Sequence, residues 1–285
     1  MQAVVALTDS RAPAARPFLK WAGGKRRVVP HIEALLDERP RRYFEPFIGG
    51  GALFFAMAED RDPDDAWATL GDLNIRLVRT WRGLRDQPQV VLEGLTRHAE
   101  RHSQDHYYDT RANDVDAMKR DGDVAAWMIY LNRTGFNGLY RVNQRGGFNV
   151  PFGRYESPRI VDEENILSVS RALQSVDIRL GDFETVFHSA EAGDLVYLDP
   201  PYVPLTKTAN FTSYTQIGFS PADHIRLRDL AAGLKERGVT VILSNHDTPE
   251  VRELYAGWDF QRVMVGRAIN SKGSKRGAVA EVLIH

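Results

Sequence analysis

A chain of 285 residues is long enough for one large domain or two modest ones. It contains no cysteine, which excludes disulfides and thiolate metal sites, and no apolar run approaches the roughly 18 residues of a membrane span. The formal net charge of -1 gives no general attraction to nucleic acid, but basic residues concentrate in 133–159 and 267–276, where local basic surfaces are possible.

The first residues, 1–16, are rich in Ala and Pro and are expected to form a loose leader. This segment has neither the basic region nor the sustained apolar core of a secretion signal. A cytoplasmic location is therefore expected.

From residue 41 onwards one pattern recurs along the chain. A short apolar run is followed by a polar or glycine-rich turn and then by a helical pattern. RRYFEP precedes FIGGGALFFAMAE, AWATLGD precedes LNIRLVRTWRGLR, VDIRLGD precedes FETVFHSAE, and VTVILSN precedes HDTPEVRELYAG. This alternation predicts an α/β fold with a mainly parallel, doubly wound sheet. Ligands of such sheets bind beyond the carboxyl ends of the strands, so we expect the functional residues in these turns.

Residues 76–165 break the alternation and are expected to form an inserted subdomain. Long polar helical stretches lead into GFNGLYRVNQRGGFNVPFGRY, where NQRGG predicts a hairpin turn between aromatic-rich arms. The long connection at 203–219 carries Phe211, Tyr214 and Phe219, so we expect it to be functional. Ser220 is then expected to cap a helix that ends at Gly238.

The turns that follow three of the predicted strands together predict a site for an adenosine-containing ligand. The three glycines at 49–51 would let the backbone approach a ligand, although a tight turn also takes glycine for steric reasons alone. Asp72 ends the next strand and could accept both hydroxyls of a ribose. Asp182 and Phe183 end a third strand. They could provide an acceptor for an exocyclic amine and an apolar surface against a purine. A lone strand-end Asp, however, is more often a helix cap.

The segment LVYLDPPY at 195–202 ends an apolar run with an acid, two prolines and a tyrosine. Proline lacks an N–H and keeps the preceding residue extended, so Asp199 and Pro200 are held stiffly. The Asp199 carboxylate and the Pro200 carbonyl could accept the two N–H donors of an aromatic amine such as adenine N6, while Tyr202 stacks on the ring. The alternative is a strand ended by Pro-Pro with a capping acid.

At these residues the chain resembles the Dam-type (class alpha) DNA adenine N6-methyltransferases of the D12 class. The resemblance rests on FLKWAGGK at 18–25, EPFIGGGALF at 45–54, GDLN at 71–74, FNGLYRVNQRGGFNVPFGRY at 136–155, LDPPY at 198–202, FTSY at 211–214, LSNHDT at 243–248 and the tail AINSKGSKRGAVAEVLI. These motifs stand in the family's order and run from residue 18 to the end of the chain, whereas residues 85–125 match no motif of the family.

The resemblance implies a site-specific, adenine-specific DNA methyltransferase of a bacterium or phage. Its cofactor would be S-adenosylmethionine, its product S-adenosylhomocysteine, and it would need no metal. Residues 17–75 and 166–285 would form a Rossmann-like catalytic domain, and 76–165 an inserted helical and β-hairpin target-recognition subdomain. The cofactor would be held by Trp21, Lys25, Glu45, Pro46, Phe47, Gly49, Gly51, Asp72, Asp182, Phe183 and Asp199. The catalytic residues would be Asp199, Pro200, Pro201 and Tyr202, which would hold an adenine flipped out of the duplex, with its N6 in line with the methyl group.

The partner implied by the resemblance is double-stranded DNA, with GATC as the target sequence. Phe136 would fill the gap left by the flipped base, with Asn137 beside it, and Arg141 would bind a guanine through two hydrogen bonds. Leu139 and Pro151 would touch a thymine methyl, and Lys20 and Tyr155 would contact the first base pair. From the residues alone, the basic loop is expected to contact phosphates through Lys272, Lys275 and Arg276.

Two alternatives remain open at this stage. One is another DPPY-type amino methyltransferase, acting on a different DNA sequence, on RNA, on cytosine N4 or on a glutamine side chain. Cytosine N4 enzymes usually carry Ser in place of Asp199, and glutamine enzymes Asn, so this aspartate favours adenine. The other is an inactive DNA-binding relative, against which the intact DPPY and glycine loop argue. The protein is expected to be a monomer without a membrane partner; a cognate restriction nuclease cannot be inferred.

Overall fold

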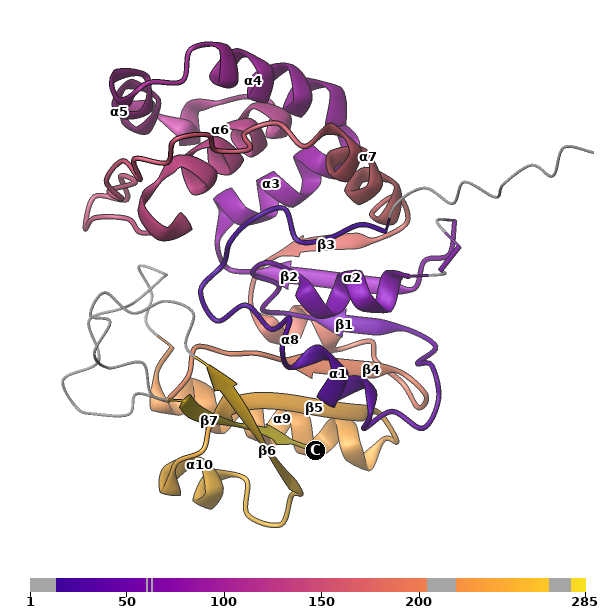
Figure 1. Ribbon diagram of the computed structural model, residues 1–285. Coiled ribbons are helices and arrows are strands. Elements are labelled where there is room, and N and C mark those ends of the chain that lie inside the picture. The colour runs from indigo at the N-terminus through magenta and orange to yellow at the C-terminus, as the bar shows by residue number, and fades with distance from the viewer. Residues whose placement is uncertain (1–13, 60, 63, 204–218, 267–277) are drawn as a thin grey trace, which may run out of the picture.

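A twisted sheet of seven strands organises the chain in this computed structural model, which describes residues 14–59, 61–62, 64–203, 219–266 and 278–285 (Figure 1). The order across the sheet is β3-β2-β1-β4-β5-β7-β6. The strands are β1 (Tyr43–Glu45), β2 (Ala68–Asp72), β3 (Asp177–Leu180), β4 (Leu195–Leu198), β5 (Thr240–His246), β6 (Phe260–Gly266) and β7 (Ala278–Ile284).

The five strands from β3 to β5 are parallel, and β7 enters antiparallel between β5 and β6. The predicted α/β class with a mainly parallel, doubly wound sheet is confirmed. The direction in which successive strands are added to the sheet reverses between β1 and β4, where β1 pairs with β2 on one side and with β4 on the other. The carboxyl ends of these three strands therefore lie at one edge, the position at which open α/β sheets bind ligands.

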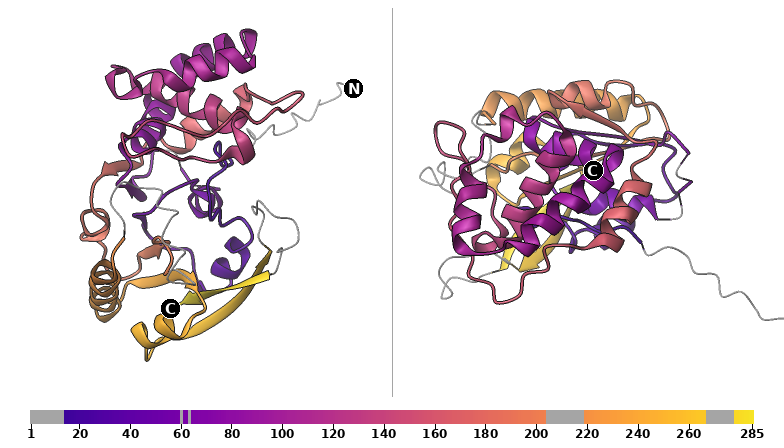
Figure 2. Two further views of the ribbon diagram at one scale, coloured as in Figure 1. Left: turned by 90° about the vertical axis from the view of Figure 1, so that its left-hand side faces the viewer. Right: turned by 90° about the horizontal axis from the view of Figure 1, so that it is seen from above.

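Helices cover both faces of the sheet. On one face lie α1 (Val29–Glu33) and α2 (Ala52–Ala58), and on the other α8 (Phe183–Phe187) and α9 (Pro221–Glu236), as Figure 2 shows. The short α10 (Pro249–Leu254) follows β5. The helix start expected at Ser220 is confirmed, because its side chain and that of Asp223 form a reciprocal capping box around the first turn of α9.

A layer of helices lies beyond the β3 end of the sheet (Figure 1). It contains α3 (Ile75–Asp86), α4 (Pro88–Glu100), α5 (Gln104–Ala112), α6 (Asp121–Thr134) and α7 (Glu163–Ala172), with 3-10 turns at Val115–Ala117 and Phe136–Gly138. The hairpin turn expected at 143–147 is confirmed: Asn143 N–H donates to Gly147 O at 2.8 Å, and Val142 pairs antiparallel with Phe148. The domain boundaries at 76 and 165 stay a prediction.

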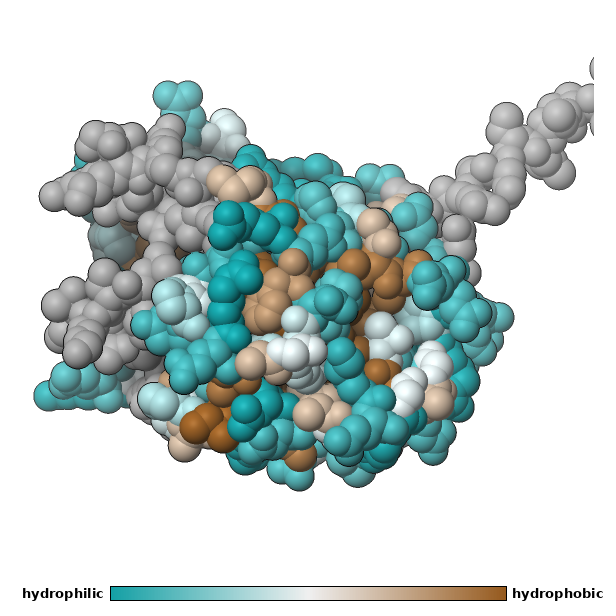
Figure 3. All heavy atoms as spheres, turned by 90° about the horizontal axis from the view of Figure 1, so that it is seen from below, coloured by the Kyte–Doolittle hydropathy of each residue, from teal (hydrophilic) through white to brown (hydrophobic). Residues whose placement is uncertain are grey.

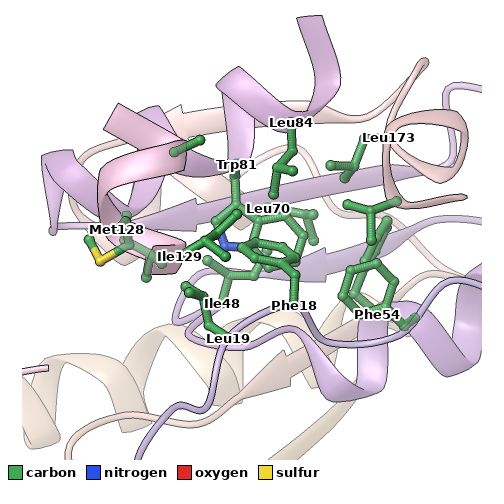
Figure 4. Packing of buried hydrophobic residues seen from close by; sticks show 14 of the residues in the cluster. Phe18, Leu19, Ile48, Phe54, Leu70, Trp81, Leu84, Met128, Ile129 and Leu173 are labelled. Atoms are coloured by element: carbon green, nitrogen blue, oxygen red, sulfur yellow. The ribbon is translucent and has the colours of Figure 1, made fainter. Parts of the chain in front are cut away.

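One apolar core joins the helical layer to the sheet. Trp81 of α3 is fully buried beside Phe18 and Phe54, and the same cluster continues through Leu70 of β2 to Ile129 of α6 (Figure 4). The end of the molecule opposite the helical layer carries a mainly hydrophilic surface with apolar patches between polar side chains (Figure 3). None of the helices in the described ranges has the length and apolar character of a membrane span.

Two glycines of this fold should respond in opposite ways to the same substitution. Gly51 has a φ of 62° and a Cβ there would overlap Trp81 Cη2, whereas a Cβ on Gly233 in α9 meets no atom within 4 Å. We expect Gly51→Ala to lower the free energy of unfolding by more than ~1 kcal/mol through strain and overlap. Gly233→Ala should raise it by ~0.5–1 kcal/mol because alanine is the better helix former. Urea unfolding of both variants tests this, and equal effects would contradict it.

Candidate active site

The glycine loop after β1 is shaped by aromatic side chains that leave no room for larger residues. Gly49 has a φ of 46°, and a Cβ on it would come within 2.7 Å of Trp21 Cδ1. Trp81 Nε1 donates to Gly49 O at 3.3 Å, which anchors the loop to α3. Trp21 itself stacks on Tyr140 with ring centroids 5.3 Å apart. The loop is therefore held in one conformation with its backbone bare of side chains.

Asp72 stands beside this loop at the end of β2. Its carboxylate accepts the backbone N–H of Asn74 at 2.8 Å and also interacts with the N–H of Gly49. Burial raises the pKa of Asp72 to about 6 despite these donors. The neighbouring apolar side chains Leu73 and Ile75 are 46% and 50% exposed. An acceptor next to exposed apolar surface and a glycine loop suits a ligand with a hydroxyl pair and an apolar part.

The end of β3 shows the helix cap that the sequence allowed for a strand-end aspartate, together with an arginine partner. Asp182 caps α8 by accepting Glu184 N–H, and Arg226 of α9 donates to both of its carboxylate oxygens at 2.9 and 2.6 Å. The Arg226 guanidinium holds the pKa of Asp182 below its usual range and lies 4.1 Å from the Phe183 ring centroid. Phe183 is buried against Phe47 at 5.7 Å. Sequence reasoning missed Arg226, which has no local signal.

At the end of β4, Asp199 forms an ion pair with Lys25. The Lys25 Nζ to Asp199 Oδ1 distance is 3.0 Å, and the two side chains are 7% and 19% exposed. Lys25 Nζ also donates to Gly23 O at 2.7 Å and lies 4.8 Å from the Tyr202 ring centroid. Burial raises the pKa of Asp199 to about 6, while Lys25 works against this shift. Lys25, expected at the cofactor, thus lies against the DPPY carboxylate. Pro200 is buried and Pro201 is exposed.

Tyr202 is fixed by residues of the two neighbouring strands. Its hydroxyl donates to Glu281 Oε2 of β7 at 3.2 Å, and its ring meets His246 of β5 edge-on at 4.7 Å. Val203 N–H donates to Asn245 Oδ1 at 3.2 Å and continues the attachment. Sequence reasoning missed Glu281; its only signal is a charged residue inside the apolar run AVAEVLI.

Glu45, the last residue of β1, is a fourth carboxyl group at this edge. It is 3% exposed and accepts a hydrogen bond from Tyr43 Oη at 2.8 Å. Burial raises the pKa of Glu45 to about 8, and the nearby Asp199 charge adds to the shift. Glu45 is therefore mainly neutral near pH 7. It and the buried Pro46 support the glycine loop from inside the sheet.

The segment before the glycine loop joins the sheet to the hairpin around the turn at 143–147. Asn132 of α6 accepts Lys20 N–H at 2.8 Å and donates to Lys20 O at 2.9 Å and to Gly138 O at 2.7 Å. The Lys20 ammonium then lies 5.5 Å from the Tyr155 ring centroid. The structure thus places the Lys20 side chain beside Tyr155, and an asparagine that sequence reasoning missed holds the Lys20 backbone.

The hairpin carries the other residues expected to read DNA. Arg141 Nε donates to Asn149 Oδ1 at 2.7 Å and its Nη2 to Asn149 O at 3.1 Å, so the opposite arm orients the guanidinium. Phe136 is 44% exposed, Pro151 is exposed and Leu139 is half-buried. Asn137, next to Phe136, has a positive φ of 56°. The roles of these residues stay a prediction.

Some expected contacts lie outside the described residues. These are the FTSY segment at 211–214 and the basic residues Lys272, Lys275 and Arg276. Within the described part of the chain, no group of three or more His, Asp or Glu side chains is placed to hold a metal ion.

Comparisons with known proteins agree on one family. A family model described as D12 class N6 adenine-specific DNA methyltransferase matches residues 21–269. A type II methyltransferase of Lactococcus lactis subsp. cremoris is 44% identical over 275 residues, which cover 94% of this chain and 94% of that protein. A type II methyltransferase of Methanocaldococcus jannaschii is 38% identical, with 94% and 98% covered. A DNA adenine methylase of Vibrio cholerae is 39% identical, with 94% and 95% covered.

The raised pKa of Glu45 predicts a loss of stability with rising pH. Folded Glu45 keeps its proton up to about pH 8, whereas in the unfolded chain it ionises above about pH 4.3. The stabilisation that results from this difference is therefore complete below about pH 4.3 and is lost as the pH rises through the folded-state pKa of about 8. Between pH 5 and 8 the wild type should lose at least ~1 kcal/mol more free energy of unfolding than Glu45→Gln. Urea unfolding measures this.

The control for this prediction is Glu93→Gln, whose side chain is 68% exposed. It should follow the wild type at both pH values. Equal losses in all three proteins would show that Glu45 is ionised in the folded state.

Proposed function

Because the chain belongs to the D12 class of N6 adenine-specific DNA methyltransferases, we propose that it transfers the methyl group of S-adenosylmethionine to an adenine flipped out of duplex DNA, within the sequence GATC. The observation that carries the proposal is the Asp199 and Tyr202 pair, held at the carboxyl edge of β4 by Lys25 and Glu281. It combines an acceptor for an amine with an aromatic face.

The residues of this edge suit an adenine amine in three ways. The Asp199 carboxylate and the Pro200 carbonyl accept its two N–H groups, which favours the form in which the nitrogen lone pair is available. Tyr202 stacks on the purine, and Glu281 prevents its ring from turning away. Lys25 stabilises the ionised form of Asp199 against burial. Catalysis is then mainly positioning.

The glycine loop fits the proposed cofactor. A Cβ on Gly49 would overlap Trp21 and one on Gly51 would overlap Trp81, so only glycine lets the loop pass these indoles and keep its shape. Asp72 accepts the ribose hydroxyls, and Leu73 and Ile75 offer the exposed apolar surface next to it. Asp182 Oδ2 keeps a lone pair beside its bond to Arg226, enough to accept one amine N–H. When bound, S-adenosylmethionine supplies an electrophilic methyl group on its sulfonium.

The hairpin supplies the sequence preference. Arg141 is oriented by Asn149 before DNA arrives, which suits two parallel hydrogen bonds to a guanine. Lys20 and Tyr155 contact the first base pair, and Leu139 and Pro151 touch the thymine methyl. Phe136, exposed beside them, fills the gap left by the flipped adenine. A monomeric enzyme in the cytoplasm, with phosphate contacts from the 267–276 loop, remains part of the proposal.

Methyl transfer and its loss in two variants test the chemistry. Tritium from S-adenosylmethionine should enter duplexes that contain GATC, and duplexes without it should accept far less. Asp199→Ala should lower the transfer rate by 10²-fold or more, as expected for loss of a preorganised polar contact, while cofactor affinity changes little. Asp72→Ala should weaken cofactor binding by ~1.5–3 kcal/mol in calorimetry. An Asp199→Ala enzyme that kept a tenth of the rate would refute its role.

Removing Arg141 should relax the choice of sequence rather than weaken all binding. An arginine fork on guanine provides ~1–3 kcal/mol of discrimination, so Arg141→Ala should methylate sites altered at one guanine-containing pair almost as well as GATC. Arg145→Ala, in the exposed turn of the same hairpin, is the matched control and should keep the preference. The salt dependence should hardly change. An equal loss on matched and altered sites would instead make the hairpin a backbone clamp.

A further inference from the structure

The helix α5 lies in the stretch for which the sequence predicts no role, yet it contacts the hairpin directly. Tyr107 Oη donates to Val150 O at 3.0 Å, and Arg111 Nη1 donates to the same oxygen at 3.1 Å. A carbonyl oxygen has two lone pairs, so α5 occupies the full acceptor capacity of Val150. Phe152 adds a ring contact to Tyr107 at 5.4 Å. Helix α5 thus holds the arm of the hairpin that follows the turn at 143–147, and it does so on both sides of Pro151.

The position of this arm also sets the position of Phe136. Phe136 N–H donates to Pro151 O at 2.8 Å, and Gly135 pairs antiparallel with Phe152. Proline has no N–H, so residue 151 cannot be fixed by donating a backbone hydrogen bond of its own. Its placement depends on the Val150 carbonyl, which α5 binds, and on its own carbonyl, which accepts Phe136 N–H. Two exposed residues expected to touch DNA are therefore aligned through one backbone segment.

The support itself is rigid. Tyr107 is fully buried, and Trp127 Nε1 of α6 donates to Thr110 O at 2.9 Å, which fixes α5 to the core. Ser103 caps the first turn of α5. A Cβ on Gly135 would lie 2.9 Å from Tyr107 Oη, so the chain passes this hydroxyl with no room for a larger residue. A movement of the Tyr107 hydroxyl would be passed to the hairpin rather than absorbed by α5.

We propose that Tyr107 and Arg111 are positioning residues for sequence readout: they hold the Val150 carbonyl so that Pro151 meets the DNA at the pair following the target adenine, while Phe136 meets the gap left by that adenine. This inference rests on the proposed function. It assigns to α5 control over discrimination at one base pair. The first pair depends on Lys20 and Tyr155, and the Lys20 backbone is held by Asn132 of α6 rather than by α5.

The test measures discrimination at two base pairs in the full-length enzyme. The transfer rate on GATC is compared with the rate on duplexes altered at the third pair, from T·A to C·G, or at the first pair. An incorrect pair costs roughly 5- to 150-fold in such systems. Tyr107→Phe removes one hydroxyl and should lower discrimination at the third pair at least threefold, with the first pair unchanged. Arg111→Met should do the same if Tyr107→Phe folds poorly.

Tyr108→Phe is the matched control, because within the described residues its hydroxyl makes no hydrogen bond. It should keep both ratios. If Tyr107→Phe and Arg111→Met keep the wild-type ratio at the third pair, or lower both ratios equally, the inference is wrong and α5 serves stability alone. A wild type that methylates GATC but ignores the third pair would also overturn it. A wild type that transfers no methyl group to adenine would instead refute the proposed function.

Discussion

The ion pair between Lys25 and Asp199 joins the two ends of the candidate site. Removing two charges from water is unfavourable unless each finds a close partner, and here each charge is the other's partner at 3.0 Å. The lysine comes from the segment before α1, and the carboxylate ends β4. Phe18 and Leu19 of that segment lie in the core, and Lys20 is tied to Asn132. One short stretch therefore places a cation on the DPPY carboxylate and another beside the hairpin.

The continuous core makes this arrangement stiff. Trp81 packs against Phe18, occupies the space that a side chain on Gly51 would need, and donates to the Gly49 carbonyl. The helical layer, the glycine loop and the segment before it thus share one buried indole. Because packed interiors transmit displacement rather than absorb it, this contact fixes the helical layer relative to the carboxyl edge of the sheet.

Three carboxyl groups at the same sheet edge have different tasks because their surroundings differ. Glu45 is enclosed with a tyrosine hydroxyl and stays protonated up to about pH 8. Asp72 faces backbone N–H groups of the loop and is partly exposed. Asp199 has a cation and titrates near pH 6. The neutral group supports the structure without adding repulsion, and the two others present negative charge where a ligand can reach them.

Much of this could be read from the sequence, because the decisive signals are local. The alternation of apolar runs, turns and helical patterns determines the parallel sheet and the edge that carries its functional residues. NQRGG determines the hairpin turn. LDPPY determines a rigid acceptor beside an aromatic ring, since proline restricts its own backbone and that of its neighbour. Family membership follows from the order of such motifs.

The tertiary structure alone decided which partner each of these residues meets. Lys25 pairs with Asp199, Arg226 closes over Asp182, and Glu281 reaches Tyr202 because β7 inserts antiparallel beside β5. The support of the hairpin by α5 likewise depends on how the helices of the inserted layer pack. These pairings join residues far apart in the chain and depend on strand order and helix packing. No local pattern encodes them, because a side chain's neighbours across a core are chosen only when the whole chain is assembled.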